Sequence, residues 1–292
     1  MIKGVYMMNK ISRFAAVLAV LFLVFGLTGC FFFPADNPSD PTDISDTTSF
    51  TAAMNGGADE VKLTQNFTGD VAVLAGKTKT LNLNGHTITG TLVVQGNLTI
   101  IDKTDSAGGI TCTEADGCAV AVDENGTVTI SDGNFTADCP LAVLEGGTAV
   151  VSGGVFEGDI GIAIDEGGTL TSLNAEVNAT MMAIYNKGSI GTISGGSYIA
   201  ETDNDYIGTV IALSNTGTIT TISAGNFSAT HNGPSGTASW AIGLNNAQGE
   251  ITTIGGGSFT ATYPLNPTHA VNSQGTITNL SDNAHFTPTL SD

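Results

Sequence analysis

Three glutamates recur at a fixed interval in the middle of the chain: Glu124, Glu145 and Glu166 are each separated by 21 residues. If the chain forms stacked coils of that length, the three carboxylates lie one above another, about 4.8 Å apart. Neighbouring carboxylates then repel each other by about 1 kcal/mol in water, a cost that is tolerable in open solvent. The arrangement becomes favourable where a Ca²⁺ ion binds the carboxylate oxygens. The pattern therefore leaves two interpretations open: solvated turn residues, or a calcium site built from Glu124, Glu145 and Glu166.

Three segments between the repeated strands are longer than their counterparts earlier in the chain: 199–209, 228–239 and 260–268. Stacking would bring these enlarged turns side by side, and binding residues concentrate on loops held by a rigid scaffold. Tyrosine offers a flat apolar face with a polar tip, which suits a sugar or a protein partner. The candidate binding residues are Asn204, Asp205, Tyr206, His231, Asn232 and Tyr263. Loop growth without a function is the alternative.

The cysteines and histidines of the chain form no recognisable metal or catalytic motif. Cys118 and Cys139 are 21 residues apart, so they should be neighbours on successive coils, and no Cys-x-x-Cys pair occurs. The histidines are scattered, and His269 is expected to pack at the edge of a coil. The residues concerned are Cys112, Cys118 and Cys139, and His86, His231, His269 and His285.

A repeat organises the body of the chain. With seven glycines aligned (Gly126, Gly147, Gly168, Gly188, Gly217, Gly249 and Gly275), each unit contains an upstream alanine flanked by apolar residues, a downstream apolar column and a closing residue that is usually aromatic. Such alternation has the period of a β-strand, and a unit this short must stack on its neighbours to bury its apolar face. Trp240 falls in the apolar column of Met182 and Ile211 and is expected in the core. The alanines are Ala121, Ala142, Ala163, Ala183, Ala212, Ala241 and Ala270; the downstream column is Val128, Ala149, Leu170, Ile190, Ile219, Ile251 and Ile277; the closing residues are Phe135, Phe156, Val177, Tyr198, Phe227, Phe259 and Phe286.

These repeats predict an all-β stack of coils over residues 50–292, with a short helix from Ser49 to Met54 capping the first coil. The endings Ser152–Phe156 (SGGVF) and Ser194–Tyr198 (SGGSY) are similar to those of parallel β-helices in the pectin-lyase-like superfamily. This resemblance implies a right-handed parallel β-helix. A β-sandwich is the alternative fold, but it does not explain seven aligned columns.

The resemblance implies that an activity on acidic polysaccharides must be considered. Lyases of that superfamily commonly use an arginine or lysine base with acid-bound calcium, but this chain has no arginine after Arg13. The related hydrolases need clustered aspartates and a Gly-His-Gly segment, whereas Gly85-His86 is followed here by Thr87. We therefore expect no catalysis, and keep a polysaccharide lyase or glycoside hydrolase as the alternative.

The N-terminus has the features of an export signal. Lys3, Lys10 and Arg13 precede an apolar run from Phe14 to Leu27, which is short for a membrane span. Leu27-Thr28-Gly29-Cys30 resembles the lipobox of bacterial lipoproteins, in which the cysteine is acylated after cleavage. This resemblance implies a signal peptide at 1–29, a lipid on Cys30 and an acidic, proline-containing tether at 30–49; an uncleaved anchor is the alternative.

Charge limits the range of partners. Beyond residue 29 the chain has five lysines against 27 acidic residues, so nucleic acid and anionic lipid headgroups are poor partners for its surface. We expect a non-catalytic lipoprotein of the cell envelope, on the outer membrane or the outer face of the cytoplasmic membrane. It would be attached to the membrane through the lipid on Cys30 and would act as a binding or adhesion module for a glycan or a protein, with no cofactor other than a calcium ion. A purely structural envelope protein is a further alternative.

Overall fold

The structure is a computed structural model that describes residues 47–104, 107–203, 208–233, 240–263 and 268–290. Cys30, the predicted signal peptide and nearly all of the predicted tether lie outside these residues. In the described part of the chain, no helix is long and apolar enough to cross a membrane.

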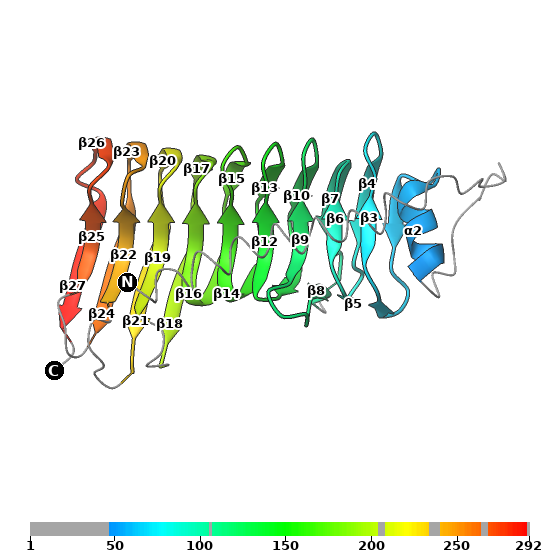
Figure 1. Cartoon of the computed structure of the whole chain (residues 1–292), viewed down its shortest axis with the longest axis horizontal. Coiled ribbons are helices and arrows are strands. Elements are labelled where there is room, and N and C mark those ends of the chain that lie inside the picture. Colours follow the sequence, from blue (N-terminus) through cyan, green and yellow to red (C-terminus); the bar gives the residue numbers. More distant parts are fainter. Residues whose placement is uncertain (1–46, 105–106, 204–207, 234–239, 264–267, 291–292) are drawn as a thin grey trace.

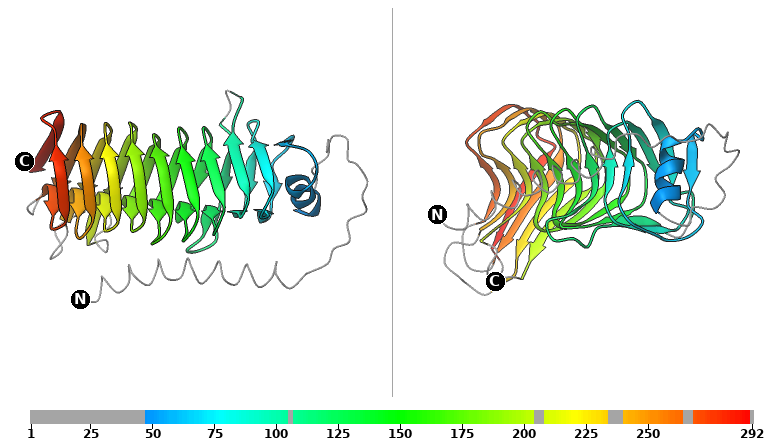
Figure 2. Two further views of the ribbon diagram at one scale, coloured as in Figure 1. Left: turned by 90° about the horizontal axis from the view of Figure 1, so that it is seen from above. Right: turned by 45° about the vertical axis from the view of Figure 1, so that its right-hand side comes forward.

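Parallel strands stack coil upon coil along the long axis of the molecule (Figures 1 and 2). This is the predicted right-handed parallel β-helix. One side is a sheet of ten short strands, and its register confirms the whole downstream apolar column from Val128 to Ile277. The strands of this sheet, in order, are β1 (Glu60–Lys62), β4 (Thr78–Asn82), β7 (Asn97–Ile101), β10 (Thr127–Ile130), β13 (Thr148–Val151), β15 (Thr169–Leu173), β17 (Ser189–Ile193), β20 (Thr218–Ile222), β23 (Glu250–Ile254) and β26 (Thr276–Leu280).

The other sides of the coils are two ladders of parallel strands that β14 (Val155–Ile164) and β16 (Glu176–Asn186) join into one sheet, because each of these long strands belongs to both ladders. The first ladder also contains β2 (Phe67–Thr68), β5 (Thr87–Thr89), β8 (Gly109–Thr111), β11 (Asn134–Thr136), β18 (Ser197–Thr202), β21 (Asn226–His231), β24 (Gly257–Tyr263) and β27 (Ala284–Leu290). The second contains β3 (Val71–Val73), β6 (Leu92–Val94), β9 (Cys118–Val122), β12 (Cys139–Val143), β19 (Thr209–Asn215), β22 (Trp240–Asn246) and β25 (His269–Ser273).

The predicted closing column runs through the core of the first ladder. Phe135 stacks on Phe156 with ring centroids 4.9 Å apart, and Tyr198, Phe227, Phe259 and Phe286 form a second continuous stack. Stacking of like rings follows from the parallel register, which repeats each position at one strand spacing. The aromatic column was therefore predicted correctly.

The alanine column is confirmed from Ala121 to Ala163, but Ala163 pairs with Tyr185 and not with Ala183. Ala183 lies opposite Ala212, as predicted, because the residues on either side of them pair. The turn after β16 is two residues shorter than the turn after β14, so the strand ends shift by two positions relative to each other. A shift of two keeps each side chain on its original face. Its consequence is that Asn186 takes the inward position that Ile164 occupies in the preceding coil.

Helix α2 (Thr47–Asn55) covers the first coil, as predicted. Phe50 and Met54 are buried, and the Phe50 ring packs edge-on against Phe67 with centroids 4.6 Å apart. Past the end of the helix, the ammonium of Lys79 donates hydrogen bonds to the carbonyls of Gly56 and Ala58. The apolar end of the stack is thus shielded from water at this side.

Candidate functional site

The enlarged turns begin as extensions of strands. β18, β21 and β24 continue past the point where β11 ends, and they pair with each other in parallel: Ala200 pairs with Ala229, which pairs with Ala261. Figure 1 shows these strands extending below the level of the earlier coils. The described parts of the three segments therefore lie side by side, as predicted.

His231 and Tyr263 are buried, with exposed fractions of 1% and 0%, so the prediction that they present their side chains to a ligand is wrong. Their rings meet edge-to-face at 4.9 Å, and His231 Nδ1 accepts a hydrogen bond from the Gly233 amide. The physical reason is that every second side chain of a β-strand points to the same side. On β21 the inward side chains are Phe227, Ala229 and His231. The same alternation places Tyr263 inward on β24.

The remaining candidates of the enlarged turns divide into two groups. Asn204, Asp205 and Tyr206 lie outside the described residues. Asn232 is exposed, and its amide donates a hydrogen bond to the Glu201 carboxylate at 2.8 Å.

Glu124, Glu145 and Glu166 occupy turns that follow β9, β12 and β14 on consecutive coils, and all three are exposed. Within the part of the chain that the structure describes, no group of three or more His, Cys, Asp or Glu side chains is placed to hold a metal ion. All three carboxylates are open to solvent, and a calcium site at these glutamates stays a prediction.

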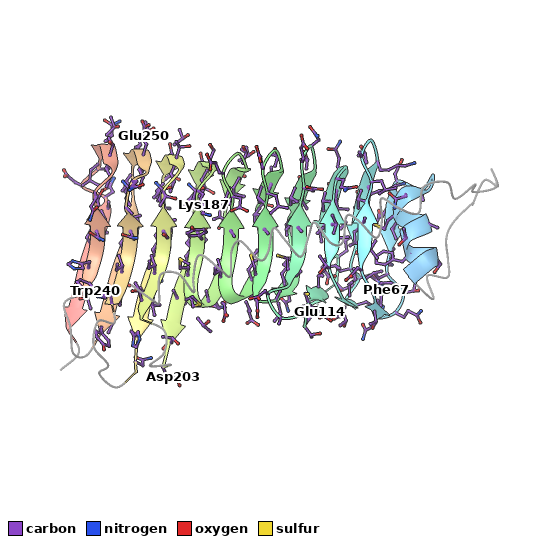
Figure 3. All side chains as sticks on the ribbon, viewed as in Figure 1. Phe67, Glu114, Lys187, Asp203, Trp240 and Glu250 are labelled. Atoms are coloured by element: carbon purple, nitrogen blue, oxygen red, sulfur yellow. The ribbon has the colours of Figure 1, made fainter. Side chains whose placement is uncertain are left out.

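Trp240 is 38% exposed, so its predicted place in the core is wrong. The structure pairs Ile211 with Ile242 and Trp240 with Thr209. Ala241 pairs with Val210 and not with Ala212, as the sequence alignment had it, because only one extra residue lies in the turn after Asn246. The Trp240 ring stacks on His269 with centroids 5.4 Å apart. Figure 3 shows where Trp240 lies, near the C-terminal end of the stack.

A groove of about 920 Å³ runs along the solenoid across five successive coils. In Figure 3, Glu114 at one end of it and Asp203, next to its other end, lie along the same lower edge of the molecule. One row of lining residues comes from register partners on β8, β11, β14, β16 and β18: Thr111, Thr136, Glu157, Asn178 and Ile199. A second row, two residues further along each strand or turn, contains Asp138, Asp159, Thr180 and Glu201.

Small residues separate the two rows. Ala137 and Ala179 are buried, and Gly158 pairs with Ala179 between them in the stack. A β-carbon on Gly158 would lie 2.1 Å from the Ala137 carbonyl oxygen, so the groove's close coil packing at this point requires glycine. The Ala137 and Ala179 side chains pack in the main core, so backbone lies between the two rows of polar side chains.

Carboxylates dominate the charge of the groove. Glu114, Asp138, Glu157, Asp159 and Glu201 line it, and its lining includes no lysine, arginine or histidine. Local hydrogen bonds fix some of these groups: Thr180 Oγ1 donates to Asp159 at 2.6 Å, and the Asp116 amide donates to Asp138 at 2.8 Å. The arrangement can accept hydrogen bonds from hydroxyl or amino groups and repels anions.

Sequence reasoning missed the groove, although a signal was present. After three of the closing residues, Phe135, Phe156 and Val177, two polar side chains flank a small one: Thr136-Ala137-Asp138, Glu157-Gly158-Asp159 and Asn178-Ala179-Thr180. In a strand, the two flanking residues share one face.

Comparison with known proteins identifies no relative. No model of a known protein family matches the chain, and no curated protein and no solved structure matches it. The fold therefore stands on the strand register alone, and function has to be argued from the groove.

Proposed function

We propose that this protein is a non-catalytic, lipid-anchored component of the cell envelope whose β-helix binds a neutral glycan chain in the five-coil groove. The observation that carries the proposal is the groove itself: hydrogen-bonding side chains repeat along it at one strand spacing, from Thr111 to Glu201. A repeating, linear site suits a repeating, linear ligand.

The chemistry of the lining favours an uncharged polymer. Carboxylates and the Asn178 amide accept hydrogen bonds from sugar hydroxyls, while the Thr136 and Thr180 hydroxyls both donate and accept. Strand backbone forms the surface between the two rows, where a sugar ring could lie flat, and Ile199 adds an apolar contact at one end. Uronate or sulfated chains would place anions beside Glu157 and Asp159, which costs free energy.

The absence of basic side chains from the lining of the groove supports binding over catalysis. Proton abstraction beside a uronate carboxylate needs a base and a cation that neutralises the developing charge. A catalytic base and a neutralising cation would therefore have to come from residues outside this lining.

The envelope location rests on the N-terminal sequence. The basic residues before Phe14, the apolar run and Cys30 support export and acylation, and the acidic segment after Cys30 would hold the β-helix away from the membrane. The low content of basic residues beyond residue 29 is consistent with a surface that does not adhere to anionic headgroups.

Thr180→Arg tests the proposal, because it places a long cation in the groove at an exposed position. The matched control is Thr171→Arg, an exposed threonine on β15 in the ten-stranded sheet. Purified full-length proteins in detergent are tested for binding on an array of neutral, acidic and basic glycans. Their affinity for a polysaccharide that binds is then measured from how strongly a gel containing it slows their migration.

The proposal predicts that the wild type and Thr171→Arg bind neutral chains and that Thr180→Arg loses at least tenfold in affinity. Binding that is unchanged in Thr180→Arg, or that is confined to acidic chains, contradicts it. Bond cleavage in the bound polysaccharide would show that the non-catalytic assignment is wrong.

A further inference from the structure

Two cysteines lie next to each other on neighbouring coils. Cys118 at the start of β9 pairs in register with Cys139 at the start of β12. Together with Ala121 and Ala142 they form a small apolar cluster that is separate from the main core. Both side chains are buried, with exposed fractions of 3% and 1%, and both thiols are free in the structure.

The spacing of the two residues suits a covalent link. Register partners on parallel strands are separated by about one strand spacing, 4.7–4.9 Å. Disulfides join cysteines whose Cα atoms are 4.4–6.8 Å apart, so the spacing between these two coils lies within that range. The two side chains pack together in the same small cluster, where the Cys139 thiol donates a hydrogen bond to the Leu141 carbonyl at 3.4 Å.

The third cysteine of the described chain belongs elsewhere. Cys112 packs in the main core, where its sulfur accepts a hydrogen bond from Thr91 Oγ1 at 3.6 Å. It therefore lies in a different cluster from Cys118 and Cys139, and it serves as an internal control.

The environment of the pair determines when a link can form. The hydrogen bond to Cys139, together with burial, raises the pKa of the Cys118 thiol well above its usual range. Because the thiolate is the reactive species, the folded pair reacts slowly with external reagents. A link would have to form while the coils assemble, and burial would then protect it from reduction.

We propose that Cys118 and Cys139 are oxidised to a disulfide during folding, so that coils β9 and β12 are covalently joined. The oxidant is an external small-molecule or protein disulfide. The thiolate of one cysteine attacks that disulfide and releases one thiolate; the second cysteine then attacks the mixed disulfide and releases the other. The oxidant gains two electrons and, with the two protons lost by the cysteines, leaves as two thiols.

The link would strengthen one end of the groove, whatever the groove binds. Asp138, which lines the groove, immediately precedes Cys139, and the Cys139 amide donates a hydrogen bond to the Gly117 carbonyl at 3.1 Å. The Asp116 amide donates to Asp138 at the same place. Two coils that contribute lining residues would thus be held in register at this point.

The test uses the full-length chain carrying Cys30→Ser, so that only three thiols remain. The protein is unfolded with reductant, refolded in a buffer of reduced and oxidised glutathione, alkylated, digested and measured by mass spectrometry. We expect a peptide pair linked through Cys118 and Cys139, two mass units lighter than the reduced pair, and a fully alkylated Cys112. The variant Cys112→Ser should form the same link.

Thermal unfolding gives an independent readout. The link closes a loop of about 20 residues, so adding reductant should lower the Tm of the refolded parent and of Cys112→Ser by about 5–10 °C. The Tm of Cys118→Ser and Cys139→Ser should not respond to reductant. The proposal is overturned if refolding leaves Cys118 and Cys139 alkylated, if Cys112 is linked to either, or if the reductant lowers all four Tm values equally.

Discussion

The Nδ2 atom of Asn186 donates a hydrogen bond to Oδ1 of Asn215 at 2.7 Å, and both side chains are buried inside the solenoid. Asn215 repeats the contact with Asn246 on the next coil, at 2.9 Å, and Asn246 donates to Ser273 Oγ. Each asparagine thus satisfies its neighbour at the same inward position of β16, β19 and β22. In the preceding coils, Ile164 and Val143 fill this position with apolar packing.

Asn215→Ala should lower the free energy of unfolding by about 3 kcal/mol, because it leaves the Asn186 donor and the Asn246 acceptor buried without that partner. Urea unfolding followed by circular dichroism measures the change. Asn226→Ala, at an exposed position of β21, is the control and should stay within about 0.5 kcal/mol of the wild type. Equal effects of the two substitutions would mean that the asparagine ladder adds nothing to stability.

Tyr263→Phe should stabilise the protein by about 1 kcal/mol. The Tyr263 hydroxyl is buried and has no hydrogen-bond partner among the residues that the structure describes, so removing it relieves a desolvation cost. Tyr198→Phe is the matched control, because the Tyr198 hydroxyl donates to the Gly195 carbonyl at 2.7 Å and its loss should cost about 1 kcal/mol. Destabilisation by Tyr263→Phe would show that the hydroxyl has a partner.

Asp102 should make stability depend on pH. Burial alone would raise the pKa of this carboxyl, but hydrogen bonds from Thr104, Gly108 and Gly85 hold the pKa below its ordinary value. Because the folded pKa is the lower one, the ionised group stabilises the fold above the unfolded pKa of about 3.9. That stability is lost as the pH falls through the folded pKa.

Asp102→Asn should therefore cost about 1–2 kcal/mol at pH 7 and much less at pH 3. Urea unfolding at the two pH values measures it, with the exposed Glu250→Gln as control. A cost that is the same at both values would exclude a role for the charge.

Cys30→Ser should abolish acylation of the protein in the producing bacterium. The sequence around Cys30 supports this proposal, and the measurement is incorporation of labelled fatty acid together with partition into detergent. Cys112→Ser should be labelled like the wild type. Labelling of the Cys30→Ser protein would place the lipid elsewhere, and an unlabelled wild-type protein retained in the membrane would indicate an uncleaved anchor.

The sequence alone determined the architecture, because repetition fixes which residues must stack. The column from Val128 to Ile277 and the aromatic column from Phe135 to Phe286 follow from spacing and apolar character, since a parallel ladder places equivalent residues next to each other. The capping helix was also predictable, since Phe50 and Met54 are one helical turn apart and can cover an open end together.

Tertiary structure alone decided which polar and aromatic residues are accessible. His231 and Tyr263 are buried because β21 and β24 continue further than the loop lengths suggested. Trp240 lies outside its predicted column because β22 pairs two positions away from the aligned register, with Ala241 opposite Val210. In strands with a period of two, a misplaced strand end or register changes the face or the column to which a side chain is assigned. The groove likewise exists only once five coils bring the residues of its two rows together. These residues are about 20 positions apart, so no single segment of the sequence contains the groove.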